Sequence, residues 1–331
     1  MARIVLGLGS SHTPQLSTET SWWEDHANRD RRNPQLLGRD GEMHVYDELA
    51  AVPEWSVAAE RLTPQVWESL HARAQDALAV LRARLEAVAP DVVVVIGDDQ
   101  EEMFRDDGMP TFAVYYGDAI YDMPPSDARK SAMPDGLRAA LWAAHGEVIE
   151  KYDVPGDLGR HVVERLILDE FDVVALSRQP QERSVGHAFT FVRRRLMGED
   201  MIPLLPVAVN AYNPPNQPSP RRCFLLGRAL RRAIESYPED LRVAVVASGG
   251  LSHFVVDEQL DKRILSGLQS RDTDALTTIP RRFMRSGTSE SLNWIAAGAA
   301  LEALDMDVVD YIPAYRSAAG TGVGMAFAVW S

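Results

Sequence analysis

Short runs of aliphatic and β-branched residues alternate with longer amphipathic stretches along the chain. The runs predict strands at residues 3–8, 91–96, 112–116, 172–176, 204–209, 243–247, 311–315 and 324–329. The run VVVVI at residues 92–96 lacks polar alternation, which is typical of a strand covered on both faces. The amphipathic stretches predict helices at residues 64–88, 158–169, 189–197, 223–237 and 289–304. This alternation predicts an α/β fold in which helices flank a mostly central β-sheet.

Residues 17–60 do not follow the pattern. They are polar, show weak periodicity and carry Trp22 and Trp23. We expect an inserted helical and loop segment that packs over the remainder of a single large domain, residues 1–331, and acts there as a lid. A packing role is the more common one for the two tryptophans. Thr63 is expected to cap the helix that begins at Pro64.

Composition narrows the class of protein. Hydrophobic residues make up 46% and charged residues 25% of the 331 residues, as in a globular protein with a large core. A lone cysteine, Cys223, excludes an internal disulfide and suggests a cytoplasmic location. No apolar run approaches the roughly 18 residues of a membrane span. The net charge of −14 argues against nucleic-acid binding, and the arginine clusters, such as residues 193–195, are expected mostly on solvated helix faces.

Four polar segments lie where a predicted strand ends or a predicted helix begins, and open α/β sheets bind ligands at the carboxyl ends of their strands. They present His12 after a Gly-Ser-Ser turn, an acidic run at residues 98–102, His253 after a Gly-Gly turn, and Glu290 at the start of a helix. Thr288 or Ser289 as the N-cap would place Glu290 in the first helical turn. Each segment has a plainer reading: a capping or packing histidine, a solvated acidic turn, or a carboxylate that serves the helix dipole. Together they suggest a metal-and-base constellation.

Five ordered motifs carry a family resemblance. GSSHTPQL, VVVVIGDDQEEMF, SVGHAF, SGGLSHF and SGTSESLNW resemble the class III extradiol ring-cleavage dioxygenases, from residue 2 to nearly the end of the chain. That superfamily includes the catalytic β subunit of protocatechuate 4,5-dioxygenase. The sequence is most similar to the 3-O-methylgallate dioxygenase-like branch, whose members also carry a long insertion after the first histidine.

The resemblance implies a single non-haem Fe(II) held by two histidines and a carboxylate. His12 matches the first ligand and Glu290 the carboxylate ligand, while His187 and His253 match acid/base groups beside the metal. At the position of the second histidine ligand the chain has Gln100. The third ligand is therefore open between Gln100, Asp99 and a histidine of the insertion.

That inserted histidine is His44, whereas His26, His71 and His145 are expected at the surface. The substrate's carboxylate is expected to meet a cationic or hydroxyl group. Arg316 and Thr321 are the candidates for that contact, with a surface ion pair an equally good explanation of Arg316. The remaining pocket candidates are Tyr212 and Asn213.

The function that the resemblance implies is extradiol cleavage of a catecholic aromatic acid of the 3-O-methylgallate, gallate or protocatechuate type by dioxygen. The expected partners are that small aromatic substrate, dioxygen and a second copy in a homodimer, with no nucleic acid and no membrane. Two alternatives stay open. One is another metal-dependent enzyme, such as a hydrolase with zinc on His12, Asp99 and Glu290. The other is a non-catalytic binding homologue.

Overall fold

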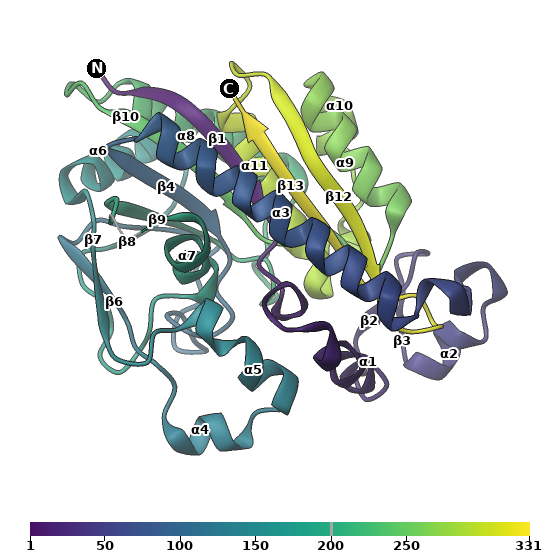
Figure 1. The fold of residues 1–331 in the computed structure, drawn as a ribbon. Coiled ribbons are helices and arrows are strands. Elements are labelled where there is room, and N and C mark those ends of the chain that lie inside the picture. The colour runs from purple at the N-terminus through teal and green to yellow at the C-terminus, as the bar shows by residue number, and fades with distance from the viewer. Residues whose placement is uncertain (199–200) are drawn as a thin grey trace.

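A nine-stranded mixed sheet forms the centre of the molecule, in the order β11-β13-β1-β10-β4-β9-β5-β8 with β12 paired to β13 (Figure 1). The computed structural model describes residues 1–198 and 201–331. The strands are β1 (Arg3–Ser10), β4 (Val92–Gly97), β5 (Phe112–Tyr115), β8 (Val174–Leu176), β9 (Leu204–Val209), β10 (Arg242–Ser248), β11 (His253–Val255), β12 (Met306–Tyr315) and β13 (Thr321–Trp330). β1, β10, β4 and β9 run parallel, and β5 and β13 are antiparallel to their inner neighbours. The α/β architecture predicted from the sequence is confirmed.

Helices cover both faces of the sheet. The 25-residue α3 (Pro64–Val88) crosses one face over β1, β12 and β13, while α8 (Pro220–Glu235) and α11 (Ser291–Ala300) pack on the other (Figure 1). The remaining helices are α1 (Trp23–Asp30), α2 (Tyr46–Ala50), α4 (Asp127–Ala132), α5 (Asp135–Ala144), α6 (Gly156–Leu168), α7 (His187–Phe191), α9 (Glu258–Ser270) and α10 (Thr273–Thr277). Thr63 caps α3 by accepting a hydrogen bond from the Val66 amide, as predicted.

Several boundaries differ from the prediction. β12 and β13 pair along ten residues each, so β12 begins five residues earlier than the apolar pattern suggested. Antiparallel pairing satisfies the backbone there although Asp307 and Asp310 break the pattern. The helix predicted at 189–197 is α7 followed by a π-turn at Val192–Leu196. The helix predicted at 289–304 begins as a 3₁₀ turn, Ser286–Glu290, so Glu290 lies at the N-cap of α11 instead of in its first turn.

The segment at residues 17–60 folds into short elements that pack on the C-terminal strands. Its hairpin of β2 (Leu36–Leu37) and β3 (Met43–His44) brings Leu36 into a small apolar cluster with Leu49, Val255 and Ala319. Trp23 is buried beside Trp67, 5.9 Å between ring centroids, and its indole donates to the Gln15 carbonyl. A packing role for Trp23 is therefore clear, and the lid remains a prediction.

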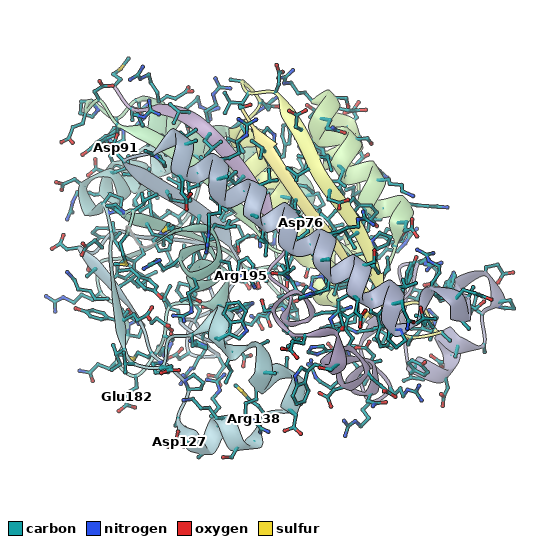
Figure 2. All side chains as sticks on the ribbon, in the orientation of Figure 1. Asp76, Asp91, Asp127, Arg138, Glu182 and Arg195 are labelled. Atoms are coloured by element: carbon teal, nitrogen blue, oxygen red, sulfur yellow. The ribbon has the colours of Figure 1, made fainter. Side chains whose placement is uncertain are left out.

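Charged side chains mostly lie outside the layers. Asp91, Asp127, Arg138 and Glu182 lie at the edge of the molecule in Figure 2, whereas Arg195 lies inside it. Arg195 is buried and donates to Ser17 Oγ and Gln75 Oε1, so its cluster is not wholly a solvated face. None of the helices that the structure describes is long and apolar enough to cross a bilayer.

The parallel centre of the sheet positions the polar groups. β1, β10 and β4 end at the same edge, where Ser10 is in register with Ser248 and Ile96 with Ala247. The residues that follow these strands therefore converge, as expected for an open α/β sheet. α1 and α5 lie side by side beyond this edge.

Candidate active site

His12 has one ring nitrogen satisfied and one without a partner. Its Nδ1 lies 3.0 Å from Ser248 Oγ, and that hydroxyl donates its proton to the Ala188 carbonyl at 2.6 Å. Because the serine proton is committed, Ser248 accepts from Nδ1–H, which leaves the lone pair on Nε2. Nε2 is buried and forms no hydrogen bond with any residue of the described chain. A buried imidazole lone pair of this kind is a metal-ligand geometry.

Two buried carboxylates face this lone pair. His12 Nε2 lies 3.3 Å from Glu290 Oε2 and 3.9 Å from Asp98 Oδ1. Burial raises the pKa of Asp98, and the negative charge of Glu290 adds to the effect. Ligand atoms of His12, Asp98 and His187 all lie within 4.8 Å of one another. Two like charges at the end of a buried sheet are costly without a cation, so these donors fit a divalent metal ion.

Glu290 is the most connected group of the site. Its Oε2 accepts the Gly250 amide at 2.7 Å, and its Oε1 accepts the Tyr212 hydroxyl at 2.7 Å. Burial opposes ionisation, but the positive charge of the adjacent His253 outweighs it and holds the pKa of Glu290 well below its usual range. The carboxylate is thus fixed in place and ionised.

His253 faces the same carboxylate from β11. Its Nδ1 donates to the Leu251 carbonyl at 2.9 Å, and its Nε2 lies 3.1 Å from Glu290 Oε1. Burial would lower the pKa of His253, yet the adjacent Glu290 raises it overall. Gly287 allows this arrangement, because a Cβ there would lie 1.9 Å from the His253 ring. The motif SGTSE therefore needs its glycine for close packing against the histidine.

His187 completes the group with a carboxylate partner that sequence reasoning missed. Its Nδ1 lies 2.8 and 3.0 Å from the two oxygens of Glu102, and its ring centroid is 4.7 Å from that of His12. Burial alone would lower the pKa of His187, but Glu102 raises it to about 10. Glu102 belongs to the acidic run after β4, which was the only sequence signal for it.

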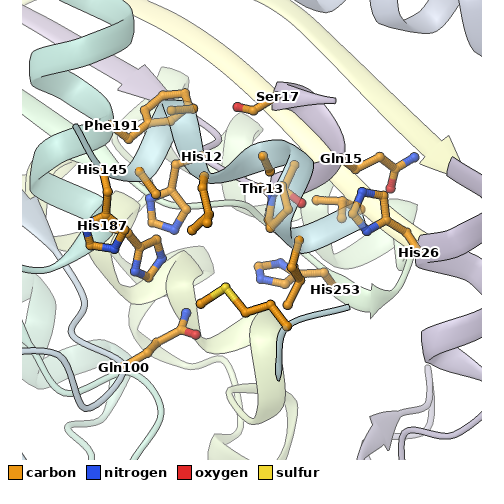
Figure 3. Close-up of a pocket in the computed structure, with 18 of the residues that line it drawn as sticks. His12, Thr13, Gln15, Ser17, His26, Gln100, His145, His187, Phe191 and His253 are labelled. Carbon is orange, nitrogen blue, oxygen red and sulfur yellow. The ribbon is translucent and has the colours of Figure 1, made fainter. Parts of the chain in front are cut away.

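A second carboxylate–histidine pair lines the same wall, and sequence reasoning placed this histidine at the surface. His145 Nδ1 lies 2.7 Å from Asp122, which is fully buried and also accepts the Gly146 amide and the Ser184 hydroxyl. In Figure 3 His145 lies beside His187. His26 is also buried, and its Nε2 lies 3.2 Å from the Thr18 hydroxyl. Both residues line the cavity, because the insertion and α5 fold over it.

The three candidates for the third ligand differ in whether their side chains lie near His12 and Glu290. Gln100 reaches the cluster, with its amide nitrogen 3.2 Å from Asp98 Oδ2 and 3.5 Å from Glu290 Oε1. Asp99 turns away and accepts three backbone amides, those of Glu102, Met103 and Phe104. His44 lies apart on β3, 3.0 Å from Asp40. Asp98, one position earlier than expected, is the carboxylate that faces His12.

The predicted substrate contacts are only partly brought together. Tyr212 and Arg316 line the cavity, whereas Thr321 and Asn213 do not. Arg316 is buried in a two-pronged ion pair with Asp30, at 2.7 and 2.8 Å, so its charge is already compensated. Thr321 is buried against the Ser317 hydroxyl, and Asn213 points to the Asp99 carbonyl.

These groups surround a cavity of about 290 Å³. Figure 3 shows His187 and His145 at one side, Gln15 and His26 at the other, and His12 and His253 between them. Apolar side chains of α5 form part of the wall: Leu137, Ala140, Leu141 and Ala144. The cavity lies just below the usual range of ligand pockets, about 300–1,000 Å³, which suits a ligand with a single ring.

Comparison with known proteins places the chain in one family. Residues 56–325 match the family described as the catalytic LigB subunit of aromatic ring-opening dioxygenase. A gallate dioxygenase of Pseudomonas putida is 43% identical over 105 residues, which cover 31% of this chain and 29% of that protein. A 2,3-dihydroxyphenylpropionate/2,3-dihydroxicinnamic acid 1,2-dioxygenase of Comamonas testosteroni is 28% identical over 179 residues, which cover 54% of this chain and 47% of that protein. The chain therefore spans less than half the length of these two relatives.

Among solved structures, an uncharacterized protein of Escherichia coli K12 aligns with 75% of this chain and 91% of its own. Its TM-score is 0.39 and its sequence identity 12%, too low to bear on the function.

Proposed function

The chain belongs to the family of catalytic LigB subunits of aromatic ring-opening dioxygenases, and from that premise we propose that it cleaves the ring of a catecholic aromatic acid with dioxygen in extradiol fashion. The substrate is of the 3-O-methylgallate, gallate or protocatechuate type, and the cofactor is Fe(II). The observation that carries this proposal is the buried, unpartnered Nε2 of His12 facing Asp98 and Glu290.

The proposed metal ligands are His12, Glu290 and Asp98. Asp98 replaces the candidate Asp99 because it is fully buried and its oxygen faces His12. Gln100 is the alternative third ligand through its amide oxygen, since side-chain amide oxygen and nitrogen are exchangeable assignments. A neutral amide binds a divalent ion more weakly than a carboxylate does. The chemistry that Fe(II) supplies is Lewis-acid activation of the diol and electron transfer to dioxygen.

The two histidines divide the proton transfers. Nδ1 of His253 is held by the Leu251 carbonyl. In the neutral imidazole, which a cation bound at Glu290 would favour, Nε2 is therefore the atom that accepts a proton from a ring hydroxyl. Nδ1 of His187 is held by Glu102, so Nε2 is the atom that donates a proton to the reacting oxygen. Tyr212 keeps Glu290 oriented through its hydroxyl. The apolar wall of α5 excludes water from the ring.

The test is oxygen uptake by protein loaded with Fe(II) without air, across gallate, 3-O-methylgallate, protocatechuate and simple catechols. We expect uptake with at least one of them and its loss in Glu290→Ala. Asp98→Asn and Gln100→Ala run beside it compare the two candidates for the third ligand. The variant that loses the true ligand should weaken Fe(II) binding more than the other, and by more than the roughly 10- to 100-fold expected when only a hydrogen-bonding partner of a ligand is lost. His44→Gln is the control that should change nothing.

Absence of uptake from protein that holds iron would contradict the proposal. Zinc in the protein as isolated, with hydrolysis of an ester or amide, would favour the metallohydrolase alternative instead. Binding of catechols without turnover by either metal would favour the non-catalytic alternative. The homodimer remains a prediction.

A further inference from the structure

Arg29 presents an unusual charge to the cavity. It lies in the last turn of α1, is half-buried and lines the cavity wall. Its guanidinium forms no hydrogen bond or salt bridge with any side chain or carbonyl in residues 1–198 and 201–331. A half-buried cation without a hydrogen-bonded partner loses hydration that distant charges restore only in part. Such a group is more often found where a ligand supplies the missing anion.

The acidic residues near Arg29 are committed elsewhere. Asp30 forms its two-pronged pair with Arg316, which also donates to Gln15 Oε1 at 2.8 Å. Asp25 accepts the amide of Gly136 at 2.9 Å. Asp30 and Asp25 act on Arg29 through their charge without a salt bridge, so Arg29 is the cation at this end of the cavity whose hydrogen-bond donors are open to a ligand.

The other charged groups of the cavity give it two different ends. Glu290 lines the part of the cavity next to His12, where Asp98 lies behind it and a cation would be favoured. His26, beside Arg29, has a pKa that burial, Arg316 and Arg29 lower to about 3 and is neutral. Arg129 on α4 also lines the cavity, but it is exposed and solvated. A ligand that chelates a metal through one edge and carries an anion at the opposite edge matches this layout.

We propose that Arg29 is the residue that binds the carboxylate of the aromatic acid and thereby sets the preference for acids over neutral catechols. The identity of the ring rests on the proposed function; the anion site does not. The planar guanidinium can hold a carboxylate with two parallel hydrogen bonds. The α5 side chains Leu137 and Leu141 give the ring an apolar surface between the two ends. Arg29 takes the role that the sequence suggested for Arg316.

The experiment measures binding of protocatechuate and of its neutral amide, 3,4-dihydroxybenzamide, by calorimetry on Fe(II)-loaded protein without oxygen. Arg29→Gln should weaken binding of the acid by about 10- to 100-fold, the usual range for a charge-assisted pair, and leave the amide within about 3-fold. Arg129→Gln is the matched control, because it removes an exposed arginine from the same cavity, and both ligands should stay within about 3-fold.

A second variant covers the case of misfolding. Arg29→Lys keeps the charge but loses the planar fork, so the acid should bind about 3- to 10-fold more weakly. Without ligand, both Arg29 variants should melt at or above the temperature of the unmutated protein, because the cation has no partner to lose. Equal weakening of acid and amide in Arg29→Gln, or no weakening of the acid, would overturn the inference.

Parallel oxygen uptake separates this inference from the proposed function. Arg29-dependent binding of the acid without uptake from any catechol would sink the dioxygenase and keep the anion site. Uptake with an acid whose KM is unchanged in Arg29→Gln would keep the dioxygenase and sink the anion site.

Discussion

At the scale of single residues, the site depends on where each proton is held. A carbonyl oxygen can only accept a hydrogen bond, so a side chain that is hydrogen-bonded to a carbonyl must be the donor. The Ala188 carbonyl fixes the proton of Ser248, which in turn fixes the tautomer of His12. The Leu251 carbonyl does the same for His253. A backbone carbonyl, acting through Ser248, thus keeps the lone pair of His12 on Nε2, where it could bind a metal ion.

Ser248→Ala tests this chain of hydrogen bonds. Without the hydroxyl, Nδ1–H of His12 loses its acceptor and the ring can rotate or change tautomer, so metal affinity should fall by about 10-fold, as for other partners of ligating histidines. Titration with Fe(II) or a spectroscopic surrogate measures the affinity. Ser291→Ala is the control, since that buried hydroxyl has no partner among the described residues. Equal affinity in Ser248→Ala would show that the serine does not orient His12.

The positions of single residues also decide how much of the site the sequence can predict. His12, His253 and Glu290 come directly after strands or at a helix start, so their convergence at one edge could be expected. The sequence could not tell Asp98 from Asp99, because the twist of the chain after β4 decides which of two adjacent carboxylates faces His12. Partners distant in sequence, such as Asp122 for His145, depend on tertiary folding alone.

At the scale of elements, the position of Glu290 depends on how two helices meet. α11 begins at Ser291 and packs on α8, and Gly227 of α8 faces the α11 backbone. A Cβ at position 227 would lie 2.0 Å from the Ala296 carbonyl oxygen. Glycine weakens an isolated helix, but here it allows the close approach.

Gly227→Ala weighs these two effects against each other. Alanine favours the helix by up to about 1 kcal/mol. Overpacking against backbone costs about 1–3 kcal/mol or more. We therefore expect a net loss of about 2 kcal/mol in the free energy of unfolding by denaturant, accompanied by weaker metal binding as Glu290 shifts. Gly108→Ala is the control, because a Cβ there meets nothing within 4 Å. A Gly227→Ala protein as stable as the control would contradict this account of the contact.

The fold itself shows what local pattern can and cannot specify. The parallel strands were predictable, because a strand buried on both faces is apolar throughout, as in β4. The hairpin of β6 (Ala119–Asp122) and β7 (Glu150–Asp153), and helices α4, α5, α9 and α10, were not predicted. β6 and β7 contain mostly polar or exposed residues and owe their form to pairing with each other. Their contribution to the site, through Asp122, was hidden for that reason.

At the scale of the whole molecule, buried carboxylates couple stability to pH. The chain carries a net charge of −14, and several acids are fully buried. Asp261 ties α9 to β12 and to the turn before β11 by accepting the amide and hydroxyl of Ser252 and the hydroxyl of Tyr311. It has no cationic partner among the residues described, and burial raises its pKa to about 7. The folded protein therefore holds this proton more tightly than the unfolded chain does.

The sign of the pH effect follows from that difference. The unfolded Asp261 releases its proton near pH 4, whereas the folded one keeps it until about pH 7. The contribution of Asp261 to the free energy of unfolding is therefore fully present below pH 4 and is lost as the pH rises through that window. A shift of about three pKa units corresponds to about 4 kcal/mol at most. Asp99, whose pKa burial and Glu102 raise to about 7, acts in the same window.

The measurement is therefore the difference in unfolding free energy between the unmutated protein and Asp261→Asn, followed by urea denaturation from pH 4 to 8. We expect Asp261→Asn to gain stability relative to the unmutated protein as the pH rises, because its side chain never ionises. A difference that stays constant with pH would show that the hydroxyl and amide donors keep Asp261 ionised in the folded protein.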